Sequence, residues 1–525
     1  MVCNYIKWDM CMRLIKRFLI LALLLIAVPC WGANYTITST EDTVDGGANV
    51  SGKGRCNAGY VSYAAGPWGV CTSADTIIID GGARGDLTFQ NFDGDPDYIT
   101  IINEDSTRVV ITATSATAGI LIDDCKYINL RGNGLSAHNW TRDCKTDSCY
   151  GIKVQVSGDP PLALVRVMGD SDNIKLQYIE ADMSGKSGGS GAENGFQVQD
   201  GALANTDTFD NFEIAYNYIH DTYYHGMYLG HNTPDAGNDP YISSFNVHHN
   251  LLEDLGAEGG ELKGVEAGST VQFHHNIVRR TRQQCIYNCG VEEYVEKGWW
   301  QYGWIFSDYY ENAYAEIYNN WIEETAGSCF HLRSAEHIVY NNVLVGCGTG
   351  TCVGELCVSK LDGYFNAIEL DKVNLGETLN RRVSEIYNNT IISPLDYGVA
   401  SLDDEVQANV NDNIIINPGG TDTPAYVNDL AACTPRGTCV EEGTGDDANT
   451  NDTSDPGFVD FTDDDDYSND DFDLASGHSV GVMGNTDLTT DFNDHTREAF
   501  TDGAYDGLSI PRLPLQGAAG DLKYK

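Results

Sequence analysis

The sequence predicts an all-β fold, a right-handed parallel β-helix, because a short pattern returns along the chain at a nearly regular spacing. In each copy an asparagine has an apolar or β-branched residue three positions before it and another two positions after it. The asparagines are separated by 33, 26, 44, 22, 47 and 24 residues, so the unit is a little over twenty residues long and tolerates insertions. They are Asn217, Asn250, Asn276, Asn320, Asn342, Asn389 and Asn413.

The length and composition of the unit favour short strands. It is too short for a pair of helices, and its apolar positions lack helical periodicity. β-branched and aromatic residues at fixed offsets are typical of strands rather than of surface loops. In a parallel coil each turn stacks on the last at about 4.8 Å, so equivalent positions form a column along the axis. We therefore expect the asparagines to form one hydrogen-bonded column at a bend of the coil.

The two ends of the chain are expected to differ from this coil. Lys16 and Arg17 precede an apolar run at residues 18–28 that is too short to span a bilayer, and small residues follow up to Ala33. This pattern is typical of a signal peptide and predicts a secreted or periplasmic protein. The chain is then divided into a signal peptide at 1–33, a β-helix catalytic domain at 34–430 and an acidic C-terminal cap region at 431–525.

Charge and cysteine usage narrow the possible partners and compartment. The formal net charge of −46 argues against nucleic acid or an anionic membrane surface as a partner. We expect a monomer. Cysteines that lie close together in an exported chain indicate disulfides that staple loops. The expected pairs are Cys56 with Cys71, Cys144 with Cys149, Cys285 with Cys289, Cys347 with Cys352 or Cys357, and Cys433 with Cys439.

Alignment of the turns on their asparagines gathers a set of polar and aromatic residues on one face. Two basic residues, Lys263 and Arg333, lie thirteen positions after an asparagine. Four more residues lie eleven positions after theirs, namely Tyr228, Glu261, Tyr287 and His331. The residues between them are mostly apolar, so the alternation of a strand predicts that the polar set points outward. The alternative is an ordinary polar surface.

Two further features lie beside this set. Asp254, Glu258 and Glu261 could hold a hard cation, and Ca²⁺ is the expected cofactor because it prefers several carboxylate oxygens. The insertion at residues 291–304 is rich in aromatic residues, which either line a wall for sugar rings or pack against the coil. The predicted ligand-binding residues are therefore Tyr228, His225, Trp299, Trp300 and Trp304, with Tyr302 in the same insertion.

The stretch G-A-E-G-G-E-L-K-G from Gly256, together with the repeats, resembles right-handed β-helix polysaccharide lyases. The nearest groups are the chondroitinase B and alginate lyase family and the Lys-dependent pectate lyases. The resemblance implies that Lys263 is the base, that calcium neutralises the substrate carboxylate, and that Arg333 assists. Arg333 lies one turn further along than the family pattern places it, and the spacing of Glu258 and Glu261 differs from that of the family's calcium ligands.

The chemistry of β-elimination is compatible with this resemblance. A proton beside a carboxylate becomes removable when a cation offsets the carboxylate charge. A lysine near cations and aromatic rings can have a lowered pKa and act as base, while His331 or Tyr287 donates to the leaving oxygen. We also expect Lys263 to be exposed, so that its removal leaves folding intact. The expected activity is that of a lyase acting on an acidic, uronate-containing polysaccharide of the alginate, pectate or glycosaminoglycan type.

Two other function classes remain open at this point. A β-helix glycoside hydrolase needs two carboxylates rather than a lysine, and Glu261 with Asp254 or Glu258 could supply them. A non-catalytic carbohydrate-binding solenoid needs no reacting groups at all.

Overall fold

The computed structural model describes most of the predicted coil. Apart from short gaps, the described residues are 76–133, 144–199, 209–230, 241–281, 302–348, 366–371 and 382–416, with isolated strands outside these ranges. The predicted signal peptide and most of the acidic region after residue 430 lie outside the described residues. No helix in the described part is long and apolar enough to cross a membrane.

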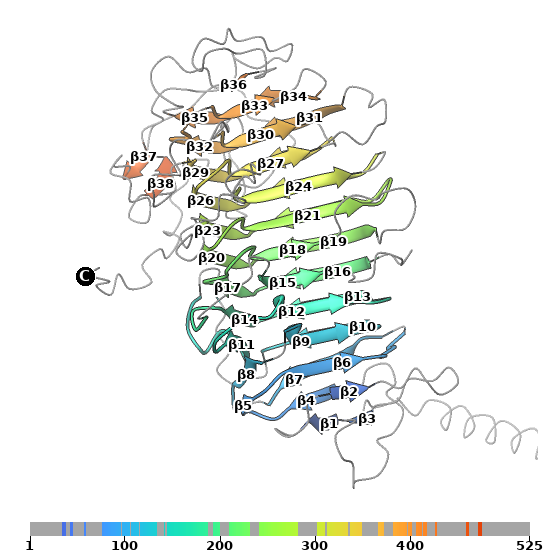
Figure 1. Ribbon diagram of the computed structural model, residues 1–525. Helices are drawn as coiled ribbons and strands as arrows, with labels where there is room; N and C mark the ends of the chain where they lie inside the picture. Colours follow the sequence, from blue (N-terminus) through green and yellow to red (C-terminus); the bar gives the residue numbers. More distant parts are fainter. Residues whose placement is uncertain are drawn as a thin grey trace, which may run out of the picture.

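The strands form three columns of parallel strands, and the chain visits the columns in turn (Figure 1). Column 1 consists of β1 (Asn34–Ile37), β4 (Thr76–Ile79), β7 (Ile99–Asn103), β10 (Lys126–Arg131), β13 (Asp172–Gln177), β16 (Phe209–Ala215), β19 (Ile242–His248), β22 (Thr270–His274), β25 (Tyr314–Tyr318), β28 (Ile338–Tyr340), β31 (Arg382–Tyr387) and β34 (Val406–Asn411). Within it, every strand pairs in parallel with the strand one turn earlier and one turn later.

Column 2 carries the predicted site residues. It consists of β2 (Thr43–Asp45), β6 (Leu87–Gln90), β9 (Ala118–Asp123), β12 (Ala163–Met168), β15 (Asn194–Val198), β18 (Met227–Leu229), β21 (Gly260–Val265), β24 (Trp304–Tyr309), β27 (Phe330–Arg333), β30 (Ile368–Asp371), β33 (Val399–Ser401) and β36 (Tyr426–Val427). Its strands are again parallel, and β3 (Asn57–Ala58) joins β2 in the antiparallel sense.

Column 3 forms the remaining sheet. It consists of β5 (Gly82–Arg84), β8 (Val109–Ala113), β11 (Ile152–Val156), β14 (Ile179–Asp182), β17 (Tyr218–His220), β20 (Leu251–Leu255), β23 (Ile277–Thr281), β26 (Trp321–Thr325), β29 (Val343–Cys347), β32 (Thr390–Ile392) and β35 (Ile414–Ile416). Beyond the coil, β37 (Phe458–Asp460) and β38 (Asp471–Leu474) pair with each other in the antiparallel sense. The three columns confirm the predicted parallel β-helix.

The asparagine column is present at the bend between columns 1 and 3. The side-chain amide of each asparagine donates to the side-chain oxygen of the next one, at 2.9–3.1 Å, from Asn217 through to Asn413. All seven asparagines are fully buried. The residue before each of six of them has a positive φ of 54–60°, which turns the chain toward column 3. The ladder thus satisfies polar groups that the bend would otherwise bury without partners.

The interior of the coil is filled by the apolar residues that alternate with the outward ones. Leu262, Phe306 and Leu332 stack on neighbouring strands of column 2 and belong to one continuous core. Trp304 is also fully buried, with its ring centroid 4.3 Å from that of Phe273. The prediction that Trp304 lines a sugar-binding wall is therefore wrong. Gly260 explains why, since a Cβ there would lie 2.6 Å from the Trp304 ring.

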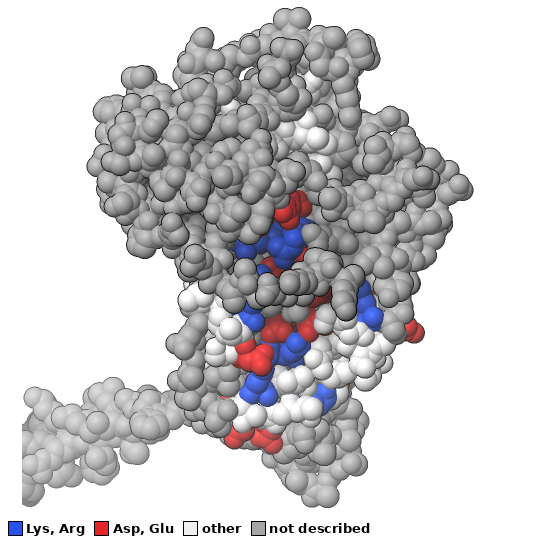
Figure 2. All heavy atoms as spheres, turned by 90° about the vertical axis from the view of Figure 1, so that its left-hand side faces the viewer, with Lys and Arg blue, Asp and Glu red and all other residues white. Residues whose placement is uncertain are grey.

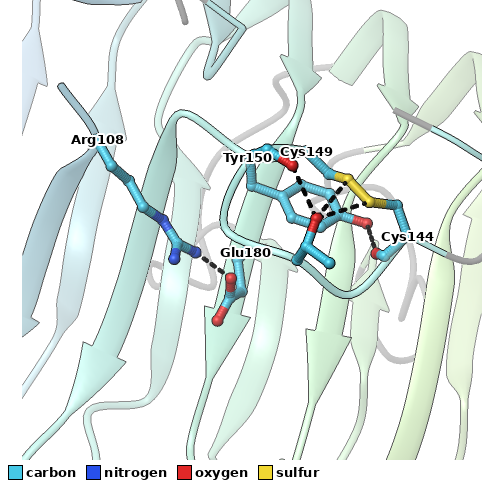
Figure 3. Close-up of a disulfide and its surroundings, with 7 residues drawn as sticks. Arg108, Cys144, Cys149, Tyr150 and Glu180 are labelled. Carbon is cyan, nitrogen blue, oxygen red and sulfur yellow. Dashed lines mark hydrogen bonds and ion pairs between the residues drawn. A yellow bond between two sulfur atoms is a disulfide. The ribbon is translucent and has the colours of Figure 1, made fainter. Parts of the chain in front are cut away.

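Two disulfides lie among the described residues. Cys144 pairs with Cys149 as predicted, and the hydroxyl of Tyr150 donates to the Cys144 carbonyl oxygen at 2.6 Å (Figure 3). Cys347 pairs with Cys329 one turn earlier, so its predicted pairing with Cys352 or Cys357 is wrong. Stacking brings residues of successive turns together, which sequence proximity alone does not reveal. The other predicted pairs fall outside the described residues.

Candidate active site

Two rows of side chains project from the outer face of column 2. The strand register places Tyr228, Glu261, Ile305, His331 and Glu369 in one row. In the second row Lys263 of β21 pairs with Ser307 of β24, and Arg333 of β27 pairs with Asp371 of the adjacent strand β30. The prediction of a shared outward face is confirmed for Tyr228, Glu261, Lys263, His331 and Arg333.

The row differs from the sequence prediction at one turn. The position between Glu261 and His331, which the offset count gave to Tyr287, belongs to Ile305. The reason is that the insertion lies between Asn276 and the strand of this turn, so the strand residue no longer lies eleven positions after the asparagine. Tyr287, Trp299 and Trp300 all fall within residues 282–301, outside the described residues.

Lys263 faces outward but is only 5% exposed, so the expectation of an exposed lysine is wrong. Its ammonium group forms an ion pair with Glu261 and lies 4.5 Å from the centroid of the Tyr228 ring. Burial alone would lower the pKa of Lys263, but Glu261 and Tyr228 outweigh burial and raise it. The predicted lowering of this pKa is therefore also wrong, and Lys263 is held as a cation.

The three carboxylates predicted to bind calcium have separate partners. Oε2 of Glu258 lies 2.6 Å from Nδ1 of His225, and both side chains are buried. Glu261 pairs with Lys263. Asp254 belongs to β20 in column 3, where its Oδ1 accepts a hydrogen bond from Nε of Arg280 at 2.7 Å. Calcium needs several oxygens around one point. These residues do not provide them, so we derive no step through calcium.

His331 is the least satisfied polar side chain of this face. It is 3% exposed, and among the described residues neither of its ring nitrogens has a hydrogen-bond partner. Its Nε2 lies 3.6 Å from Oε1 of Glu369 and 3.5 Å from Oδ2 of Asp371, and its ring centroid lies 4.3 Å from that of Tyr302. A buried polar group without a partner is rare and needs a reason, and proton exchange with a ligand is one.

Glu369 and Tyr302 complete the surroundings of His331. The Tyr302 hydroxyl donates to Oε1 of Glu369 at 3.3 Å, and Ser328 and Asn366 donate to Oε2 at 2.8 and 3.2 Å. Burial raises the pKa of Glu369, partly offset by His331. Burial and the nearby carboxylates raise the pKa of Tyr302 well above its usual value, so the phenol keeps its proton.

Arg333 is the accessible cation of the face. Its Nε lies 3.3 Å from Oδ2 of Asp371, and its side chain is 36% exposed. It also lowers the pKa of Glu261, together with the nearer Lys263 and His225 and against the effect of burial. Two carboxyl groups of one row, the half-buried Glu261 and the buried Glu369, thus have pKa values moved in opposite directions, downward for Glu261 and upward for Glu369. Such divergence is typical of sites that move protons.

Sequence reasoning missed Glu369, Asp371, Ser328 and Asn366. The first two could have been found, because I-E-L-D from Ile368 alternates in the same way as F-H-L-R from Phe330 and E-L-K from Glu261. The offset count failed there because a further insertion separates this turn from Asn342.

Solved structures similar to this chain include three carbohydrate-active enzymes. Pectate lyase Pel9A is 10% identical, covers 91% of this chain and 96% of its own, and has a TM-score of 0.44. An alginate lyase from Paenibacillus sp. str. FPU-7 is 13% identical, covers 75% and 99%, and has a TM-score of 0.34. The GH136 lacto-N-biosidase from Eubacterium ramulus is 12% identical, covers 76% and 67%, and has a TM-score of 0.37. No protein-family model and no curated protein matches the chain.

Proposed function

We propose that this chain is a lyase that cleaves a uronate-containing acidic polysaccharide on the outer face of column 2. The observation that carries the proposal is His331, a buried imidazole whose nitrogens have no hydrogen bond within the described part of the chain. It lies beside a protonated phenol and an accessible guanidinium. These are the three kinds of group that elimination beside a carboxylate requires. The polymeric substrate also favours a secreted or periplasmic location.

The cations Lys263 and Arg333 are assigned to the substrate carboxylates. They project from the same row, two strands apart, which corresponds to about 10 Å by strand spacing. Ser307 lies between them and is small. Positive charge at the carboxylate stabilises the carbanion-like transition state that forms when the adjacent proton leaves. Lys263 suits this task because its raised pKa keeps it charged.

Proton transfer is assigned to His331 and Tyr302. His331 takes the C5 proton, the C5–H electrons form the C4–C5 double bond, and the C4–O bond breaks. The leaving oxygen receives a proton from the hydroxyl group of Tyr302. Glu369 accepts the Tyr302 hydrogen bond before the reaction and orients the phenol. The resemblance gives the role of base to Lys263 instead, and that role stays a prediction to be tested.

A glycoside hydrolase is the second candidate, because Glu261 and Glu369 have oppositely shifted pKa values. However, the two residues lie three strands apart in one row, which corresponds to about 14 Å between their backbones. Hydrolases place their carboxyl groups about 5 to 9.5 Å apart. The spacing therefore favours the lyase.

The test is to incubate the protein with alginate, pectate, chondroitin, ulvan and neutral glycans. A lyase gives products with a C4–C5 double bond conjugated to the carboxylate, which absorbs in the ultraviolet. New reducing ends that carry oxygen from isotopically labelled water, without that absorbance, would establish hydrolysis instead. Absence of cleavage on every glycan would contradict both enzyme proposals.

The Lys263→Arg variant separates the two roles of Lys263. Arginine keeps the positive charge but cannot act as a base. We expect Lys263→Arg to keep a substantial part of the activity and Lys263→Ala to lose it. An inactive Lys263→Arg variant with an unchanged melting temperature would return the role of base to Lys263.

Calcium is tested separately. Because the predicted carboxylates already contact other side chains, activity is expected to survive a calcium-selective chelator. Loss of activity that added calcium restores would show that calcium takes part through other residues.

A further inference from the structure

Four histidines lie together at the bend between columns 1 and 3, away from the proposed active site. They come from V-H-H-N and F-H-H-N on two consecutive turns, at the ends of β19 and β22. The rings of His248 and His274 stack with their centroids 4.9 Å apart and an angle of 0° between their planes. Those of His249 and His275 stack at 4.7 Å and 2°. Parallel stacking therefore brings four imidazoles into one group, here called the histidine cluster.

The Nδ1 atoms of the cluster face one another. Nδ1 of His248 lies 2.8 Å from Nδ1 of His249, and Nδ1 of His274 lies 2.8 Å from Nδ1 of His275. Potential ligand atoms of His249, His274 and His275 all lie within 4.8 Å of one another. The three side chains are partly exposed, so an ion from solvent can reach them.

The outer nitrogens of two rings contact side-chain oxygens. Nε2 of His274 lies 3.0 Å from Oδ1 of Asn246, and Nε2 of His248 lies 3.7 Å from Oε1 of Glu213. Asn246 and Glu213 are register partners one turn apart, so each histidine contacts the equivalent side chain of the preceding turn. An acceptor at Nε2 favours the proton there, so Nδ1 of His248 and of His274 accepts the hydrogen bond from the neighbouring ring. An ion that displaces the shared proton would bind these Nδ1 atoms instead. Metal-binding histidines commonly have such an acceptor at the nitrogen that does not bind the metal.

The fold itself does not require histidine at these positions. In the column of His248 and His274 the following turns carry Tyr318, Tyr340 and Tyr387, which stack in the same way. In the column of His249 and His275 the following turns carry asparagines with the same positive φ, namely Asn319, Asn341 and Asn388. Tyrosine and asparagine therefore serve the coil equally well, and the concentration of imidazoles in two turns needs another explanation.

We propose that the histidine cluster binds one divalent transition-metal ion of the zinc class through its Nδ1 atoms. Imidazole nitrogens suit Zn²⁺, Cu²⁺ and Ni²⁺, whereas calcium and magnesium prefer oxygen. A zinc–nitrogen bond is about 2.0–2.1 Å long. The rings therefore move inward from their stacked positions when the ion binds. The ion would join the turn of β19 to the turn of β22.

A second group of potential ligands among the described residues, Glu180, Asp182 and His220, is a weaker candidate. Nζ of Lys153 lies 2.7 Å from Oε1 of Glu180 and 2.5 Å from Oδ2 of Asp182. A cation already neutralises both carboxylates, so this group serves as the control.

The test is calorimetric titration of the full chain with zinc chloride, together with melting curves with and without zinc. We expect one zinc ion per chain and a higher melting temperature with zinc. The double variant His249→Asn/His275→Asn introduces asparagine, which the next turns carry at the equivalent position with the same positive φ. It should melt like the wild type without metal and bind zinc more than about tenfold more weakly. The control His220→Asn should bind zinc like the wild type.

Three results would overturn the proposal. The wild type could fail to bind zinc, which would make the cluster a purely structural stack. The double variant could bind zinc with wild-type affinity. Finally, His220→Asn could abolish zinc binding while the double variant keeps it, which would move the site to Glu180 and Asp182.

Discussion

The outer faces of columns 3 and 2 both carry buried charges, but they use them differently. On the column 3 face, positive and negative side chains gather along the coil axis (Figure 2). Each of five carboxylates there has a cationic nitrogen within 3.0 Å. These pairs are Glu180 and Asp182 with Lys153, Glu253 with Lys145, Asp254 with Arg280, and Glu323 with Arg279. Arg108 also contacts Glu180 (Figure 3).

The pKa values show the same contrast. On the column 3 face, burial would raise the pKa of each carboxyl group, but nearby cations outweigh burial and lower the pKa of Glu180, Asp182 and Glu253 to about 2. On the column 2 face, the pKa of Glu261 is lowered while that of Glu369 is raised, and His331 has no hydrogen bond to any residue that the structure describes. The column 3 face thus pairs its carboxylates with cations, whereas the column 2 face holds two carboxyl groups whose pKa values are shifted in opposite directions.

Acid should destabilise the protein mainly through the column 3 face. Glu180, Asp182 and Glu253 have pKa values near 2 in the folded state, below their usual values. Depressed folded-state values stabilise the protein above about pH 4.5, and this stability is lost as the pH falls toward 2. We expect the free energy of unfolding, measured by denaturant titration, to fall by several kcal/mol across that range. A flat profile between pH 4.5 and 2.5 would contradict this pairing of carboxylates with cations.

The Glu253→Gln variant should lose stability but keep activity. The Glu253 carboxylate is 3% exposed and contacts Lys145, Arg280 and the Tyr218 hydroxyl. Removal of one charge from a buried network costs about 3 kcal/mol. Urea unfolding measures the loss, and the rate on the best substrate provides the control. A loss below about 0.5 kcal/mol would show that these ion pairs contribute little.

The Glu369→Gln variant should behave in the opposite way. Burial raises the pKa of Glu369, so its charge opposes folding at neutral pH. Glutamine keeps a side-chain oxygen for Ser328 and removes the charge. We expect a gain of about 1 kcal/mol in the free energy of unfolding at pH 7, with reduced activity. If the variant is less stable than the wild type at pH 7, Glu369 is not a strained carboxylate.

Features that depend only on where a residue lies within its own turn could be predicted from the sequence. The asparagines have fixed neighbours, so their ladder and the alternation of Leu262 and Lys263 could be predicted directly. Counting positions from each asparagine failed where a turn contains an insertion. It assigned Tyr287 to the position of Ile305 and missed Glu369.

Other properties depend on contacts between turns and could not be predicted from one strand. The direction of the Lys263 pKa shift follows from Glu261 and from Tyr228 on the preceding turn. The pairing of Cys347 with Cys329 likewise joins residues that stacking brings together. The inward position of Trp304 depends on the space that Gly260 leaves one turn earlier.

The most direct test of the account compares His331→Gln with His220→Gln. Each variant removes one imidazole from an outer face, His331 from column 2 or His220 from column 3. Asp221 and Glu180 raise the pKa of His220 to about 9, against the effect of burial. We predict that His331→Gln lowers kcat/KM by about 10²- to 10⁴-fold with little change in melting temperature. His220→Gln should melt at a lower temperature and keep the wild-type rate. A fully active His331→Gln variant, or equal effects of both variants on rate, would contradict the account.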